Sequence, residues 1–454
     1  MTFTPTHFGF PARRIVSGLI SSVLVLLLTI APRGSPAYSV LSHEEVVDLS
    51  WKDQIVPLLL SRFPHATPDD LIRAHAYAYG GCTLQDIGYY PFGNHFFSDL
   101  LHYVRTGDFV LNLLNEASDV NEYAFALGAL AHYAADTYGH PAVNKATADE
   151  YPRLRSKFGN KITYDEAPVA HLQTEFGFDI VEVVHNRYPP EAYHSFIGFE
   201  VSKPLLERAF RETYGFEVKQ ILTHEDLAIG TYRRTVSSLI PKMTKVAVLE
   251  YGKRVEKDNP SYDSRKLRYR ISRAEYEKSW GTTYQKPGFG SRVLSFFIDL
   301  MPKVGPLQGL AMHLPNADTQ QSFLHSMNDT VDHFNGYLTQ LRQQPPYRAS
   351  LDLPDRDLDT GALTAPGQYK LADFTYSKLL DTIVKKPETP IPGALRARLL
   401  DFYATGAPHH VKEKSEVWSA TQQNVALLRN AKLDVLKVSD QPTATQQPAI
   451  PINH

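Results

Sequence analysis

Three residues with metal-binding side chains recur at helical spacing between positions 131 and 140. His132, Asp136 and His140 follow one another every four residues, so on a helix they lie along one stripe. Two imidazoles and a carboxylate are ligand types that Zn²⁺ binds. Pro141 follows directly and predicts the end of the helix. The His140 ring can then turn away from the other two side chains, so that one stripe serves two metal ions.

A second stripe of the same kind follows in the predicted helix 167–184. His171 and Glu175 are again four residues apart, and Asp179 comes one turn later. One such pair alone is more often an ordinary hydrogen-bonded pair than a ligand pair. Metal binding becomes the stronger interpretation only when the two stripes are taken together, in order, with the candidates that precede them.

Three further candidates lie upstream of these stripes. Asp86 and His95 flank a loop at 88–94 that is rich in Gly, Tyr and Pro. Asp86 by itself is a typical turn residue, and His43 by itself a half-exposed residue near a helix start. Because all three precede the two stripes in a fixed order, we interpret them together as further ligands.

The first 37 residues have the pattern of a signal peptide. Arg13 and Arg14 precede an apolar stretch at 15–30, and small residues stand at Ser35 and Ala37. Cleavage after Ala37 would leave Tyr38 as the N-terminus, with a free amine and carbonyl five residues before His43. The sequence thus predicts export to the periplasm or the medium, with an uncleaved membrane anchor as the alternative.

The composition excludes some sources of stability and some partners. Cys82 is the only cysteine, so no intramolecular disulfide forms. The chain of 454 residues has a formal net charge of −2, which gives no general attraction to nucleic acid or anionic membranes. Core packing and bound metal are the remaining ways to stabilise an exported chain of this kind.

The periodicity of apolar residues predicts an all-α fold, because no segment alternates with period two for long. A catalytic core is expected at 38–200, a helical extension at 201–438 and a Pro/Gln/Thr-rich disordered tail at 439–454. The expected helices are 43–60 with a kink or break near Pro57, 68–81, 96–104, 122–138, 167–184, 202–214, 224–246, 291–300, 319–341 and 369–384.

The order of these candidate ligands resembles the zinc-dependent phospholipase C superfamily, which includes the fungal single-strand-specific zinc nucleases. The resemblance covers Tyr38 to about Val184. It implies a multi-helix bundle with three zinc ions between its helices, extended here by C-terminal helices. It also implies that the mature N-terminal residue is itself a ligand.

The resemblance implies a role for each candidate. The first zinc has Asp86, His95, His132 and Asp136; the second has His140, His171 and Glu175; the third has the backbone amine and carbonyl of Tyr38, with His43 and a bridging Asp136. Asp86 would also orient or deprotonate the attacking water. Tyr38 stands where the family usually has tryptophan, and two spacings, 86–95 and 136–140, are shorter than usual. His102 is therefore a possible substitute ligand.

The implied reaction is phospholipase C-type hydrolysis of a phosphodiester in a phospholipid head group. Glu175 ends the second stripe as in phospholipases C, and the chain lacks both the disulfides of the fungal nucleases and a basic stripe with interleaved aromatics. A nuclease or nucleotidase, and a non-catalytic metal-stabilised protein, are the alternatives. The apolar stretch Val293–Met312 is either a peripheral membrane contact or buried core. The sequence leaves the oligomeric state open.

Overall fold

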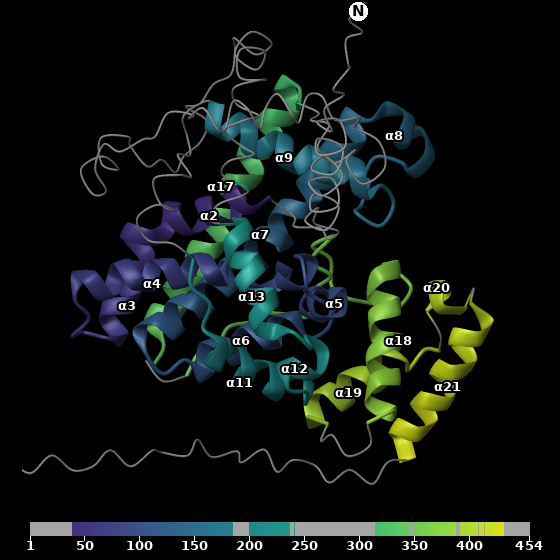
Figure 1. The fold of residues 1–454 in the computed structure, drawn as a ribbon. Helices are drawn as coiled ribbons and strands as arrows, with labels where there is room; N and C mark the ends of the chain where they lie inside the picture. The colour runs from purple at the N-terminus through teal and green to yellow at the C-terminus, as the bar shows by residue number, and fades with distance from the viewer. Residues whose placement is uncertain are drawn as a thin grey trace, which may run out of the picture.

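The described part of this computed structural model is built from helices packed around one another (Figure 1). It comprises residues 39–184, 199–236, 240, 314–345, 348–386, 391–406, 408–412 and 414–430. Within these ranges there is no β-strand, and a single isolated bridge joins Arg356 to Leu363. The predicted all-α class is confirmed. The predicted signal peptide, Tyr38, the helix 291–300, the apolar stretch 293–312 and the tail 439–454 lie outside the described residues.

The helices follow one another with short connections. The first part of the chain contains α2 (Val40–Ser50), the π-helical η1 (Trp51–Ile55), α3 (Val56–Arg62), α4 (Pro68–Gly81), the 3₁₀ turn η2 (Leu84–Tyr89), α5 (His95–Tyr103), α6 (Thr106–Glu116), α7 (Val120–Glu150), α8 (Pro152–Phe158) and α9 (Pro168–Val184). The later part contains α11 (Lys203–Tyr214), α12 (Val218–Ile221), α13 (Glu225–Arg234), α17 (Ala317–Gln343), α18 (Lys370–Val384), α19 (Gly393–Phe402), α20 (His409–Lys412) and α21 (Ser415–Asn430). No described helix is both long and apolar enough to cross a membrane.

Helix α7 is the centre of the bundle, and α2, α4, α6, α9 and α17 pack around it (Figure 1). The closest of these contacts, with α4, depends on glycine. A Cβ added to Gly128 would lie 2.1 Å from the carbonyl oxygen of Ala78, and one added to Gly81 would lie 2.0 Å from that of Phe125. The absence of both side chains lets the two helix backbones touch.

The prediction that Pro141 ends the central helix is wrong, because α7 continues to Glu150 with Pro141 inside it. A proline costs about 3 kcal/mol inside a helix, since it leaves the carbonyl one turn earlier without its donor. That carbonyl belongs to Thr137. The backbone of Gly361, with φ of +71°, lies so close that a Cβ there would be 2.3 Å from the Thr137 oxygen. Packing of this later segment on both sides of the proline favours the continuous helix over the local cost.

The N-terminal helices follow the sequence more closely. The kink expected near Pro57 is a π-helical turn at η1, after which Pro57 stands in the first turn of α3. Helix α4 begins at Pro68 and ends at Gly81, as predicted. Its N-cap Thr67 and Asp70 form a capping box in which each side chain accepts from the other's backbone N–H. The prolines and the capping box, which are local features of the sequence, therefore set the starts of α3 and α4.

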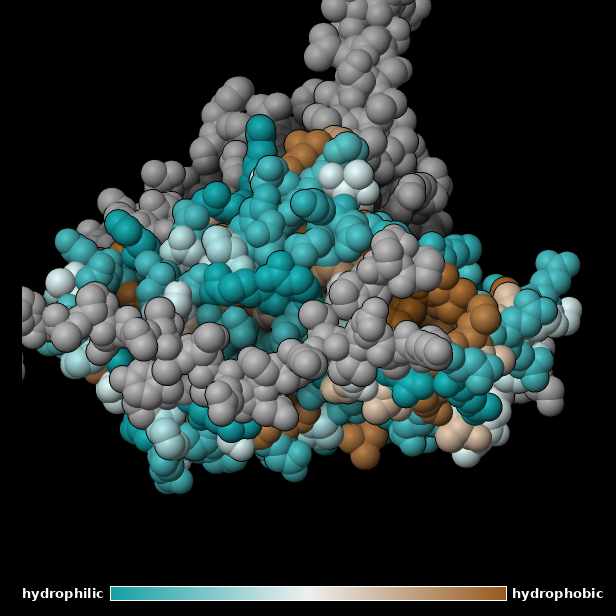
Figure 2. All heavy atoms as spheres, turned by 90° about the horizontal axis from the view of Figure 1, so that it is seen from below, coloured by the Kyte–Doolittle hydropathy of each residue, from teal (hydrophilic) through white to brown (hydrophobic). Residues whose placement is uncertain are grey.

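Buried apolar side chains from both halves of the chain form one continuous core, from Val40 in α2 to Leu428 in α21. The later helices therefore pack on the earlier bundle. Seen from below, most of the described surface is hydrophilic, and apolar residues gather toward the end that holds α18 to α21 (Figure 2). Between α17 and α18, residues 353–363 return to the inside of the bundle and contact α5, α6 and α7.

Candidate metal centre

Three groups of imidazole and carboxylate side chains meet in the interior of the bundle, each with donor atoms within 4.8 Å of one another. We name each group after one of its members. They are the His43 group (His43, His132, Asp136), the Asp86 group (Asp86, His102, His132) and the Glu175 group (His140, His171, Glu175). Every one of these residues is at most 1% exposed.

The His43 and Asp86 groups are joined by shared ligands. Oδ2 of Asp136 lies 3.0 Å from Nε2 of His132 and 3.6 Å from Nε2 of His102, while Oδ1 lies 3.5 Å from Nε2 of His43. Oδ1 of Asp86 is 3.4 Å from the same His102 nitrogen. The carboxylate of Asp136 thus has one oxygen directed at each group, as expected for a residue that bridges two cations.

The Glu175 group is built from α7 and α9. Oε1 of Glu175 lies 2.8 Å from Nε2 of His171, one turn earlier on α9, and 3.9 Å from Nε2 of His140 on α7. The stripe on α7 therefore serves separate groups, with His132 and Asp136 in two of them and His140 in the third. The sequence predicted this division, although α7 does not end at Pro141.

Four of the histidines are oriented by the backbone. Nδ1 of His102 is paired with the Ser98 carbonyl at 2.8 Å, and Nδ1 of His132 with the Cys82 carbonyl at 2.9 Å. The remaining two pairs are Nδ1 of His140 with the Leu358 carbonyl, and Nδ1 of His171 with the Ile162 carbonyl at 3.4 Å. A carbonyl only accepts, so each Nδ1 carries the proton. Each Nε2 then presents a lone pair to its group, which is the usual arrangement of a histidine that binds a metal.

Burial and neighbouring carboxylates shift the pKa values of the side chains in these groups. Burial lowers the pKa of His102, but the carboxylates of Asp86 and Asp136 raise it to about 10. Burial lowers the pKa of His171 to about 4. Burial, together with the charges of Asp136 and Asp86, raises the pKa of Glu175 well above its usual range. A buried divalent cation would offset the cost at Glu175 and bind the neutral imidazole of His171, and the carboxylates of Asp86 and Asp136, which favour positive charge at His102, would equally favour the cation.

The hydrogen-bond inventory fits the same conclusion. Buried polar atoms are normally paired. Here both oxygens of Asp86, Asp136 and Glu175 accept no hydrogen bond, and neither do the Nε2 atoms of His102, His132, His140 and His171. This set of nitrogen and carboxylate donors, without thiolate, suits zinc. The residues present therefore fit the metal that the sequence predicts.

The structure does not bring His95 to these groups. His95 is the first residue of α5 and is exposed, with its ring 5.5 Å from that of Tyr89. Two turns later on the same helix, His102 is fully buried beside Asp86 and Asp136. The interior face of α5 therefore presents His102, the substitute that the sequence suggested.

Asp179 lies next to the centre and not within it. Its Oδ1 accepts a hydrogen bond of 2.8 Å from the Ser42 hydroxyl, and its Oδ2 one of 3.4 Å from the Leu41 N–H. Burial raises the pKa of Asp179 to about 7. The carboxylate ties α9 to the start of α2 and so positions His43 at the site.

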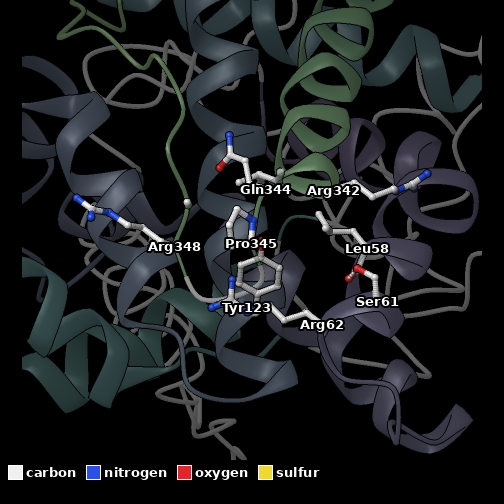
Figure 3. Close-up of a pocket in the computed structure, with 10 residues that line it drawn as sticks. Leu58, Ser61, Arg62, Tyr123, Arg342, Gln344, Pro345 and Arg348 are labelled. Carbon is white, nitrogen blue, oxygen red and sulfur yellow. Dashed lines mark hydrogen bonds between the residues drawn. The ribbon is translucent and has the colours of Figure 1, made fainter. Parts of the chain in front are cut away.

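One pocket of the described surface lies apart from the centre. It has a volume of about 180 Å³ and is lined by residues of α3, α7 and the end of α17, with the segment after it. Figure 3 shows Tyr123 and Pro345 at its centre, while the Arg342 and Arg348 side chains point outward on opposite sides. None of its lining residues belongs to the three groups.

Comparison with known proteins agrees with the geometry. Residues 42–221 match the family model of the zinc dependent phospholipase C, which confirms the resemblance found in the sequence. All eight residues of the three groups lie inside this segment. At the level of the family, the match supports a zinc-dependent phosphodiester hydrolase with a phospholipid substrate. No curated protein and no solved structure matches the chain.

Sequence reasoning missed one segment that reaches the site. Residues 357–359 contact α5 and α7 through the Leu358 backbone and the Asp359 side chain. The only local signal is the alternation of Asp355, Asp357 and Asp359 in a connector rich in proline and charge. Nothing in that pattern indicates a position beside ligands more than 200 residues earlier.

Proposed function

We propose that the protein is an exported phospholipase C-type enzyme that hydrolyses phosphodiester bonds of phospholipid head groups with three zinc ions. One observation carries the proposal. Three buried groups of carboxylates and imidazoles lie inside the segment that matches the family, and the carboxylate oxygens of Asp86, Asp136 and Glu175 accept no hydrogen bond. Tyr38, as the N-terminal residue after cleavage, would add its amine and carbonyl beside His43.

Each group has a task in the reaction. Zinc, when bound, neutralises phosphate oxygens and lowers the pKa of a coordinated water to about 7. Asp136 holds the His43 and Asp86 groups together, and the Nδ1 hydrogen bonds fix the imidazoles in one orientation. Asp86, with both oxygens unpartnered and one of them 3.4 Å from His102, orients the attacking water or accepts its proton. His102 takes the ligand position that the sequence assigned to His95.

The first test uses the secreted protein. We expect N-terminal sequencing to begin at Tyr38 and elemental analysis to find about three zinc ions per chain. We expect hydrolysis of phosphatidylcholine vesicles to release the phosphorylated head group, and Asp136→Asn to abolish it. Three zinc ions without turnover of vesicles or of a chromogenic phosphodiester would make the metal a structural element. Preferential cleavage of single-stranded DNA would make the enzyme a nuclease.

A further inference from the structure

We propose that Asp359, in the chain beyond the matched segment, is an additional acidic residue of the metal centre. We further propose that the turn 357–361 around it holds His140 in position. This inference rests on the proposed function, because it requires that the centre binds zinc. It concerns a part of the chain for which the family match, ending at residue 221, assigns no role.

The first argument is the state of the Asp359 carboxylate. The side chain is fully buried. Its Oδ2 accepts hydrogen bonds from the hydroxyls of Tyr103, at 2.8 Å, and Tyr369, at 2.6 Å. Its Oδ1 is buried and accepts none. Leaving one carboxylate oxygen without a hydrogen bond in the interior is costly. The carboxylates of the three groups are in the same condition.

The second argument is where the carboxylate lies. Asp359 interacts electrostatically with His102 of the Asp86 group and with His171 of the Glu175 group. Its charge also acts on Glu175. The backbone of Leu358, the residue before Asp359, is bonded to His102 and to His140, so Asp359 lies beside two groups that share no ligand with each other. A carboxylate in this position adds negative charge where cations of both groups would be held.

The third argument is the backbone around it. The Leu358 carbonyl accepts from Nδ1 of His140, and the Leu358 N–H donates to the His102 carbonyl at 3.0 Å. Asn144, one turn after His140, donates from its side chain to the Asp359 carbonyl at 2.9 Å. The turn thus bonds to residues of both groups and fixes the His140 ring. Partners of this kind, one step from the metal, typically affect metal affinity 10- to 100-fold.

The test compares two substitutions of the same type in the full chain. Asp355 lies four residues earlier, and its carboxylate is bonded to Thr106, Tyr376 and Arg398, away from the three groups. Zinc affinity is measured by competition with a chelating dye, and stability by urea unfolding in EDTA. We expect Asp359→Asn to weaken zinc binding about 10- to 100-fold. We expect Asp355→Asn to lower stability and leave zinc affinity unchanged.

The outcomes separate the two proposals. Wild-type protein that binds no zinc would refute the proposed function itself. Wild-type and Asp359→Asn proteins that bind zinc with equal affinity and stoichiometry would refute only the role of Asp359. Should Asp359→Asn not fold, Tyr369→Phe decides, because it removes one donor to the carboxylate and keeps the charge. We expect a several-fold weaker zinc affinity for that variant, and an unchanged affinity would overturn the proposal.

Discussion

Glu175→Gln should change stability in opposite directions with and without zinc. The substitution keeps the shape of the side chain and removes its charge. In the zinc-bound protein it removes one anionic ligand from the Glu175 group. A structural zinc site contributes roughly 10–16 kcal/mol through about four ligands. We therefore expect a loss of about 3 kcal/mol, or roughly 100-fold in Kd for that zinc.

Without zinc the same charge is destabilising. Burial first, and then the charges of Asp136 and Asp86, raise the pKa of Glu175 well above 4.5. In the folded metal-free protein the Glu175 carboxyl therefore keeps its proton above pH 4.5, where the unfolded chain has lost it. The resulting loss of folding free energy begins near pH 4.5 and grows with pH until the pH reaches the raised pKa. The cost grows by about 1.4 kcal/mol per pH unit within this range. The neutral amide of the Glu175→Gln variant avoids this cost, so the variant should be the more stable form at pH 7 and equal to wild type below about pH 4.

The assay is urea unfolding at pH 7, in excess zinc and in EDTA, followed by circular dichroism. Glu122→Gln is the matched control, because Glu122 is a carboxylate of the bundle outside the three groups. Its expected loss is the same in both buffers. If Glu175→Gln lowers stability by the same amount with zinc and with EDTA, the carboxylate is a structural hydrogen-bonding group, and the reasoning for the metal centre is wrong.

Three further predictions follow from individual contacts. Oε2 of Glu122 accepts from the Ser118 N–H and hydroxyl and from Arg208, at 2.8–2.9 Å, and these donors lower its pKa against the opposing effect of burial. Glu122→Gln should lower the free energy of unfolding by about 1 kcal/mol at pH 7. In unfolding measured as a function of pH, the difference in stability between the variant and the wild type should disappear as the pH falls below 4.5 and through the lowered pKa of Glu122. Gly128→Ala should destabilise the protein by about 2 kcal/mol, because its methyl group would meet the Ala78 carbonyl. Gly230→Ala, at a helical position with nothing within 4 Å, should instead stabilise the protein by up to about 1 kcal/mol. Equal shifts in Tm for the two variants would contradict the packing argument. His102→Ala should lower the zinc content retained after dialysis and His95→Ala should not; the opposite result would return the ligand role to His95.

The sequence by itself determined the all-α class, several of the helices and most of the candidate ligands, while α6, α19 and α21 were not among the predicted helices. Helical periodicity and local caps are properties of neighbouring residues, so α4 and the all-α class follow from them. The stripes at His132 and Asp136, and at His171 and Glu175, depend only on the pitch of a helix. Once the helix is formed, four-residue spacing places both side chains on one face.

Only the tertiary structure decided between His95 and His102 and revealed Asp359. Both histidines lie on α5, and the choice depends on which face of that helix meets α7 in the interior. At Pro141, where α7 continues, the helix packs against Gly361, more than 200 residues later in the chain. Contacts between distant segments are set by packing and by the pairing of buried polar groups. No local pattern encodes either of them.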